Sequence, residues 1–161
     1  MIPAPGADAV VTELPTVADT EAFGETVGRE LVAGDVVLLA GPLGAGKTAL
    51  VRGLARGLGV TGTVASPTFV IAREHPSAGD GPALVHVDAY RLIGDGTAAR
   101  PPDVAAELDD LDLDTELDRA VVAVEWGVGV AERLAGSAVT ITLERRDDDT
   151  RVATLRRTAR P

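Results

Sequence analysis

The sequence predicts an α/β fold, with a mostly parallel central sheet flanked by helices and an antiparallel hairpin near the C-terminus. Two observations carry this prediction. An apolar run at Val36–Ala40 leads into the glycine-rich segment Gly41–Thr48 and then into a helical pattern. Two later apolar runs, Ala83–Val87 and Ala120–Val124, are each followed by an acidic residue. Strand, crossover helix and strand is the order that builds a parallel sheet.

Composition bounds the class of protein. A length of 161 residues predicts a single domain, residues 1–161, with a loose leader at residues 1–7 that contains Pro3, Pro5 and Gly6. Hydrophobic residues make up 45% of the chain and aromatic residues 2%, so the core is built from Val, Leu, Ala and Ile. The absence of cysteine excludes disulfides and thiolate metal sites. Neither a membrane span nor a signal peptide is found, so we expect a cytoplasmic protein with no membrane partner.

The charge balance bears on partners. The formal net charge is −10, whereas a protein that grips nucleic acid by itself needs a basic face. We therefore expect no DNA partner, and we expect any RNA to be held by another subunit. The positive charges gather near the C-terminus, where they either form a solvated strand pair or touch a nucleotide or partner: Arg145, Arg146, Arg151, Arg156, Arg157 and Arg160.

The first half of the chain alternates strand and helix patterns. Val10–Leu14 predicts a short edge strand, and Thr16–Ala33 has apolar residues at helical spacing before Gly34. Val36–Ala40 is uniformly apolar, as in a strand buried on both faces of a parallel sheet. Lys47–Leu58 predicts a helix with one apolar side, ending at Gly59.

The middle of the chain is less regular. Val64–Ala72 predicts a strand that Ser66-Pro67 interrupts with an exposed bend, because proline cannot donate to a sheet. His75–Pro82 predicts a turn, and the strand Ala83–Val87 follows. Ile93–Asp118 is broken by Gly and Pro and then carries eight acidic residues between Asp103 and Asp118. Their spacing is not that of a calcium loop, so this segment is either an acidic surface or a docking face for a basic partner.

The last part predicts the end of the sheet. Ala120–Val124 is an apolar strand, and Val130–Leu134 predicts a short helix. Val139–Glu144 and Arg151–Leu155 alternate in polarity, with a run of aspartates between them as the turn. We expect these two antiparallel strands to close the sheet.

The strongest motif lies at Gly41–Thr48. Gly41, Gly46, Lys47 and Thr48 fill the fixed places of G-x-x-x-x-G-K-[ST], the phosphate-binding loop of P-loop NTPases. In that loop the glycines bend the chain and a helix N-terminus presents free N–H groups to an anion. Lys47 is the only lysine in the chain, and a flexible ammonium is the group that reaches nucleotide phosphates. The sequence therefore predicts a P-loop NTPase-like fold that binds a nucleotide.

Two carboxylates are candidates for the metal and the attacking water. Ligands of open α/β sheets bind at the carboxyl ends of the strands, where Asp88 and Glu125 follow apolar runs. Thr48 supplies the hydroxyl that binds Mg²⁺ in such loops. The residue pattern does not decide which acid holds the metal and which orients the water. His86 shares a face with Asp88 in an extended segment, and a histidine so placed is more often structural than catalytic.

Several motifs together resemble the TsaE (YjeE) family of small bacterial P-loop ATPases. They are the phosphate loop, Ser66-Pro67-Thr68-Phe69, His86-Val87-Asp88-Ala89-Tyr90-Arg91-Leu92 and Val124-Glu125-Trp126. The resemblance spans roughly Thr20–Leu155. It implies an ATPase required for the threonylcarbamoyl modification of adenosine 37 in tRNA. It also implies that the protein acts with the TsaD and TsaB subunits, contacts tRNA through their complex, and leaves threonylcarbamoyl transfer to TsaD.

The resemblance also implies roles for individual residues. Thr48 and Glu125 hold Mg²⁺, Asp88 is required for hydrolysis, and Lys47 acts on the phosphates. Thr68 matches a switch-like threonine. The remaining ATP-binding positions are the loop residues Gly41, Gly44, Ala45, Gly46 and Ala49, with Trp126 near the nucleotide and Thr20 near the adenine.

Two other functions compete with this interpretation. A small-molecule kinase that transfers the γ-phosphoryl group of ATP to a metabolite usually carries an arginine-rich lid, whereas the candidate lid Gly94–Asp118 is mainly acidic. A GTP-dependent switch needs an Asn-Lys-x-Asp motif for guanine, which is impossible here because Lys47 is the sole lysine. ATP is therefore the expected nucleotide.

Overall fold

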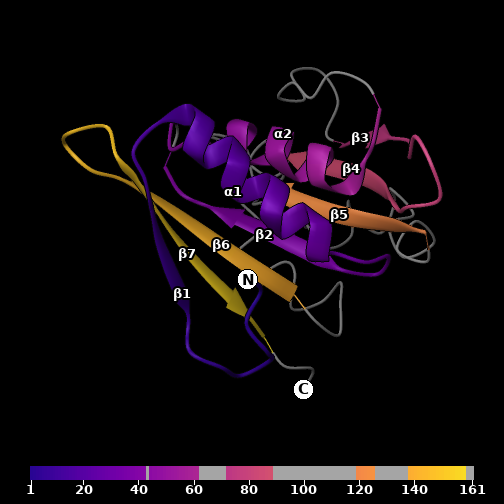
Figure 1. Ribbon diagram of the computed structural model, residues 1–161, viewed down its shortest axis with the longest axis horizontal. Helices are drawn as coiled ribbons and strands as arrows, with labels where there is room; N and C mark the ends of the chain where they lie inside the picture. Colours follow the sequence, from indigo (N-terminus) through magenta and orange to yellow (C-terminus); the bar gives the residue numbers. More distant parts are fainter. Residues whose placement is uncertain (43, 62–71, 89–118, 126–137, 159–161) are drawn as a thin grey trace, which may run out of the picture.

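One sheet with two neighbouring helices on one face organises the described part of the chain (Figure 1). A computed structural model describes residues 1–42, 44–61, 72–88, 119–125 and 138–158. The elements are β1 (Val10–Leu14), α1 (Val17–Glu30), β2 (Val36–Ala40), α2 (Lys47–Leu58), β3 (Ala72–His75), β4 (Ala83–Asp88), β5 (Ala120–Glu125), β6 (Ala138–Arg145) and β7 (Arg151–Arg157). No helix among these residues is long and apolar enough to cross a membrane.

The strand order is β1-β7-β6-β2-β5-β4-β3. The four central strands β6, β2, β5 and β4 run parallel, while β1, β7 and β3 each join the sheet antiparallel to a neighbour. The carboxyl ends of β2, β5 and β4 therefore lie at the same end of the parallel strands. The predicted α/β class with a parallel centre is confirmed, and β2 is buried on both faces as its apolar run predicts.

The position of the C-terminal hairpin differs from the expectation. β6 and β7 pair antiparallel as predicted, but they do not close the sheet, because β6 also pairs in parallel with β2 and β1 lies outside β7. A strand as apolar as β2 is stabilised by neighbours on both edges, and β5 and β6 supply them. The hairpin consequently lies next to the loop that follows β2.

Two element boundaries also differ from the expected ones. The helix predicted at Thr16–Ala33 is shorter, since Thr16 is its N-cap and Leu31 already has extended dihedral angles. Leu31 turns into the core, 4% exposed, while Val32 is 61% exposed. Strand β3 runs through His75, where a turn was expected. Most of the predicted strand Val64–Ala72, the segment Ile93–Asp118 and the helix Val130–Leu134 lie outside the described residues.

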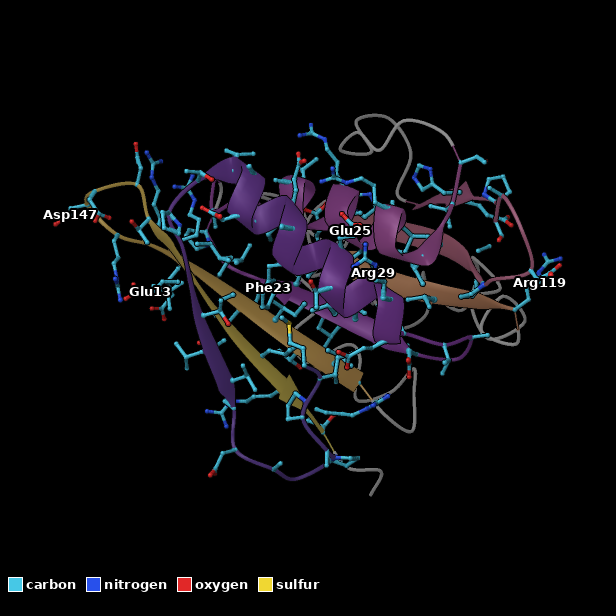
Figure 2. The ribbon with its side chains drawn as sticks, in the orientation of Figure 1. Glu13, Phe23, Glu25, Arg29, Arg119 and Asp147 are labelled. Atoms are coloured by element: carbon cyan, nitrogen blue, oxygen red, sulfur yellow. The ribbon has the colours of Figure 1, made fainter. Side chains whose placement is uncertain are left out.

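The leader at residues 1–7 contacts the rest of the protein. Ile2 packs against the core, and the backbone N–H of Gly6 donates to the carbonyl oxygen of Arg157 at 3.3 Å. The core itself lies between the helices and the sheet, where Phe23 of α1 faces the strands (Figure 2). Leu50 and Leu54 of α2 and Leu39 of β2 are fully buried there.

Glycines let α1 and α2 approach closely. A Cβ atom on Gly24 or Gly28 of α1 would lie 2.4 or 2.5 Å from a backbone oxygen of α2. A Cβ atom on Gly53 or Gly57 of α2 would lie 2.1 or 2.2 Å from a backbone oxygen of α1. Backbone atoms cannot rotate away as a side chain can. The helix pair is therefore fixed in place, and with it the residues at the amino ends of both helices.

We expect Gly53→Ala to destabilise the protein although alanine favours helices. Overpacking a tight contact costs about 1–3 kcal/mol, which lowers the melting temperature by roughly 3–10 °C in a chain of this size. Thermal unfolding followed by circular dichroism measures the change. Gly79→Ala is the matched control, because a Cβ atom there meets nothing within 4 Å. Equal melting temperatures for the two variants would contradict the close-packing argument.

Candidate nucleotide and metal site

The amino end of α2 offers uncapped backbone donors at the end of β2. Gly46 is the N-cap, with a φ of 102° that favours glycine, and no side chain among the described residues caps it. Helix α1 is different, because Thr16 and Asp19 form a capping box that satisfies its first amides. The first turn of α2 also contains no acidic residue. The amides at this end are thus suited to an anion.

Lys47 folds back over the loop that precedes it. Its Nζ donates to the carbonyl oxygens of Gly41 at 2.8 Å and Pro42 at 2.9 Å, and the residue is 6% exposed. The backbone N–H of Ala45 donates to the Pro42 oxygen at 3.1 Å, which closes a tight turn inside the loop. The only lysine ammonium group of the chain is therefore held at the start of the loop by two of its carbonyl oxygens.

The two candidate acids lie at the same level of the sheet as the end of β2. Leu39 pairs with Glu125, and Glu125 pairs with Asp88, in the parallel registers of β2, β5 and β4. Paired residues of neighbouring strands are about 5 Å apart between their backbones. Gly41 begins the loop just beyond Leu39, and half-buried Thr48 lies in the first turn of α2. The fold thus brings together the phosphate loop and both carboxylate positions.

His86 is the partner of Glu125, a pairing that sequence reasoning missed. The distance from Nε2 of His86 to Oε2 of Glu125 is 2.6 Å, and the residues are 0% and 4% exposed. The Nδ1 atom of His86 has no hydrogen-bond partner among the described residues. The signal in the sequence was the spacing of His86 and Asp88, which indicated a shared face of the strand but not the neighbouring strand. The contact fixes the orientation of the Glu125 carboxylate.

A cavity of about 280 Å³ opens beside the loop. Three predicted nucleotide-binding residues line it, namely Thr20, Gly46 and Ala49. Thr20 is 1% exposed, and its hydroxyl donates to the Thr16 carbonyl oxygen at 3.3 Å. The remaining lining residues are Pro15, Thr16, Val17, Arg145, Asp149 and Arg151. The cavity therefore lies between the amino ends of α1 and α2 and the β6–β7 hairpin, and its lining does not include Asp88 or Glu125 among the described residues.

Two members of the C-terminal arginine cluster reach this cavity from the hairpin. Arg145 pairs with Asp149, and both line the cavity together with Arg151. Arg146 instead pairs with Glu13 of β1, 2.8 Å away on the surface. In the turn, the pKa of Asp148 is held below its usual value because its carboxylate accepts a hydrogen bond from the backbone N–H of Thr150. Figure 2 shows Asp147 at the hairpin tip and Arg119 at the opposite, amino end of β5.

Thr68 and Trp126 lie outside the described residues. The described part of the chain contains no group of three or more His, Cys, Asp or Glu residues that could hold a metal ion.

The fold and the site define the class of protein, a P-loop nucleotide-binding protein with an α/β sheet. Residues 14–153 match the model of a family described as "Threonylcarbamoyl adenosine biosynthesis protein TsaE". The chain belongs to the TsaE family, as its motifs predicted.

Relatives and a solved structure agree with this assignment. The chain is 53% identical to the tRNA threonylcarbamoyladenosine biosynthesis protein TsaE of Mycobacterium bovis, over 88% of this chain and 83% of the relative. It is 53% identical to TsaE of Streptomyces coelicolor over 80% of both chains, and 36% identical to TsaE of Bacillus subtilis over 84% of this chain and 78% of the relative. The crystal structure of Bacillus subtilis YdiB superposes with a TM-score of 0.68 at 29% identity, covering 96% of this chain and 86% of that one.

We expect the buried His86–Glu125 contact to show energetic coupling. A double-mutant cycle of His86→Leu and Glu125→Leu should give a coupling free energy of about 1–3 kcal/mol, because either single change leaves a buried polar group without its partner. Urea unfolding measures the four stabilities. The exposed pair Glu13–Arg146 is the matched control, with expected coupling below about 1 kcal/mol. Additive effects at His86 and Glu125 would contradict the assigned contact.

Proposed function

We propose that the protein binds and hydrolyses ATP as the ATPase subunit of tRNA threonylcarbamoyladenosine biosynthesis. One observation carries the nucleotide part of the proposal. The amino end of α2, which no described side chain caps, has Lys47 folded over its loop and lies at the strand ends that carry Asp88 and Glu125. A helix end of this kind binds phosphate. Membership of the TsaE family supports the pathway.

The phosphates would lie against the loop amides from Gly44 to Thr48. Lys47 would exchange its bonds with the carbonyl oxygens of Gly41 and Pro42 for bonds with phosphate oxygens, since an ammonium binds either acceptor. The adenosine would enter the neighbouring cavity, where Thr20 and Ala49 form part of the wall. Trp126 and Thr68 are proposed to complete the nucleotide contacts.

Mg²⁺ fits the chemistry of two side chains of this site. The Thr48 hydroxyl and the Glu125 carboxylate are oxygen ligands of the kind that Mg²⁺ prefers, and Glu125 is already oriented by His86. The bound ion supplies charge neutralisation for the transferring phosphoryl group. Asp88, at the neighbouring strand end, is the candidate that orients the attacking water. In this proposal Glu125 therefore holds the metal and Asp88 orients the water.

The partners and the cellular place are part of the same proposal. We infer weak hydrolysis by the isolated protein and stimulation by TsaD and TsaB, because a switch-like ATPase completes its catalytic group on docking. A net charge of −10 agrees with tRNA being held by those subunits instead of this chain. In this proposal the whole chain, residues 1–161, acts as one ATPase domain in the cytoplasm.

We expect Lys47→Ala, Asp88→Ala and Glu125→Ala to lower ATP hydrolysis in the presence of TsaD and TsaB by about 10²-fold or more, because each removes a charge that acts on the phosphates, the water or the metal. Steady-state phosphate release measures the rates. Asp80→Ala is the matched control, since Asp80 is an exposed acid in the turn before β4. Equal wild-type activity with and without the partners would contradict the switch and favour a small-molecule kinase.

We expect nucleotide and metal to stabilise the protein together. A non-hydrolysable ATP analogue with Mg²⁺, at a hundred times its dissociation constant, should stabilise the fold by about 2.7 kcal/mol. This corresponds to roughly 5–10 °C in the melting temperature. Chelation of Mg²⁺ by EDTA should remove part of that increase in the wild type and in Glu144→Gln, an exposed acid of β6. In Glu125→Gln the EDTA-sensitive part should be absent; its persistence would exclude Glu125 as a ligand.

A further inference from the structure

Arg151 at the start of β7 reaches across the molecule to the phosphate loop. Its Nε donates to the carbonyl oxygen of Ala45 at 3.0 Å, and its Nη2 donates to the carbonyl oxygen of Gly44 at 3.2 Å. A further bond from Nη1 to the carbonyl oxygen of Asp149 fixes the guanidinium within its own hairpin. One side chain thus ties two consecutive loop peptides to the β6–β7 hairpin, although more than a hundred residues separate them in the chain.

The bonds to Gly44 and Ala45 determine where the next amides point. A trans peptide is planar, and its C=O and N–H groups point in opposite directions. The Gly44 oxygen accepts from Arg151, and the N–H of the same peptide, that of Ala45, points into the loop and donates to the Pro42 oxygen at 3.1 Å. By the same geometry the bond from Arg151 to the Ala45 oxygen directs the N–H of Gly46 away from the guanidinium.

The loop needs such an external tie because its own residues define its shape weakly. Gly44 and Gly46 have φ angles of 80° and 102°, and glycine crosses between backbone regions at little cost. The hairpin can hold the loop because it is itself part of the sheet: β6 pairs with β2 directly beside the loop. A Cβ atom on Gly41 would lie 2.6 Å from the carbonyl oxygen of Leu143 in β6. Hairpin and loop are therefore in close contact at two separate points.

We propose that Arg151 is a positioning residue that preorganises the phosphate loop for the nucleotide. It acts by holding the peptides of Gly44 and Ala45, so that the Ala45 N–H stays bonded within the loop and the amides from Gly46 onward are directed to the phosphates. It needs no contact with the phosphates. Preorganised donors bind an anion more tightly because no ordering of the loop is required on binding. The inference rests on the proposed nucleotide site and adds the hairpin to it.

The test compares ADP binding by calorimetry in full-length variants. Arg151→Met keeps the bulk of the side chain and removes the donors, so the dissociation constant for ADP should rise about tenfold or more. Arg151→Lys keeps the charge but lacks the planar fork, and it should show a smaller but measurable loss. Arg156→Met, an exposed arginine of the same strand, and Arg146→Met in the hairpin are matched controls that should bind ADP as the wild type does.

NMR spectroscopy distinguishes a change in the position of the loop from a general loss of structure. In nucleotide-free protein, the amide resonances of Ala45 and Gly46 should shift in Arg151→Met, while those of the core strand β2 stay in place. Unchanged loop resonances, or full ADP affinity in either Arg151 variant, would overturn the proposed role. If Arg151→Met fails to fold, Arg151→Lys decides by the same two measurements. Failure of the wild type to bind ADP would instead contradict the proposed function itself.

Discussion

The amino end of α2, which no side chain of the described residues caps, is the feature on which the rest of the proposed site depends. A polar cap at this position would stabilise the helix by about 1 kcal/mol, and α1 has one in Thr16. At Gly46, where α2 begins, no side chain of the described ranges forms such a cap, and Lys47 folds over the loop just before it. In the part of the chain that the structure describes, this helix end is therefore left to an anion from outside. This is a local loss of stability that a bound phosphate would recover.

Because β2 is a central strand, the loop that follows it has a neighbouring strand on each side, and each of these strands brings residues to the loop. On one side β5 brings Glu125 to the level of Leu39, and His86 of β4 contacts the Glu125 carboxylate. On the other side β6 brings the hairpin whose Arg151 holds the loop carbonyls. Glu125 thus lies on the side of the proposed metal, and Arg145, Asp149 and Arg151 lie on the side of the cavity. The glycine contact between α1 and α2 then sets Thr20 in the cavity wall.

Local patterns predicted the elements that carry their own signals. Val36–Ala40 and Lys47–Leu58 begin and end as predicted, because an apolar run, a glycine-rich turn and an amphipathic helix are defined within a few residues. The helix at Thr16 ended early because Leu31 is drawn into the core, a contact made with distant residues. The hairpin was paired correctly but placed at the wrong position in the sheet. Alternating polarity identifies a half-buried strand and says nothing about which strand lies beside it.

The sequence by itself determined the class, the family and the phosphate loop, because glycine, lysine and threonine at fixed spacing act through local backbone geometry. The tertiary structure alone decided three things: the bond between His86 and Glu125, the reach of Arg151 to Gly44 and Ala45, and the cavity around Thr20. Each joins residues from different strands or helices. Such contacts depend on strand order and register, which arise from the packing of the whole sheet and leave no signal within a single segment.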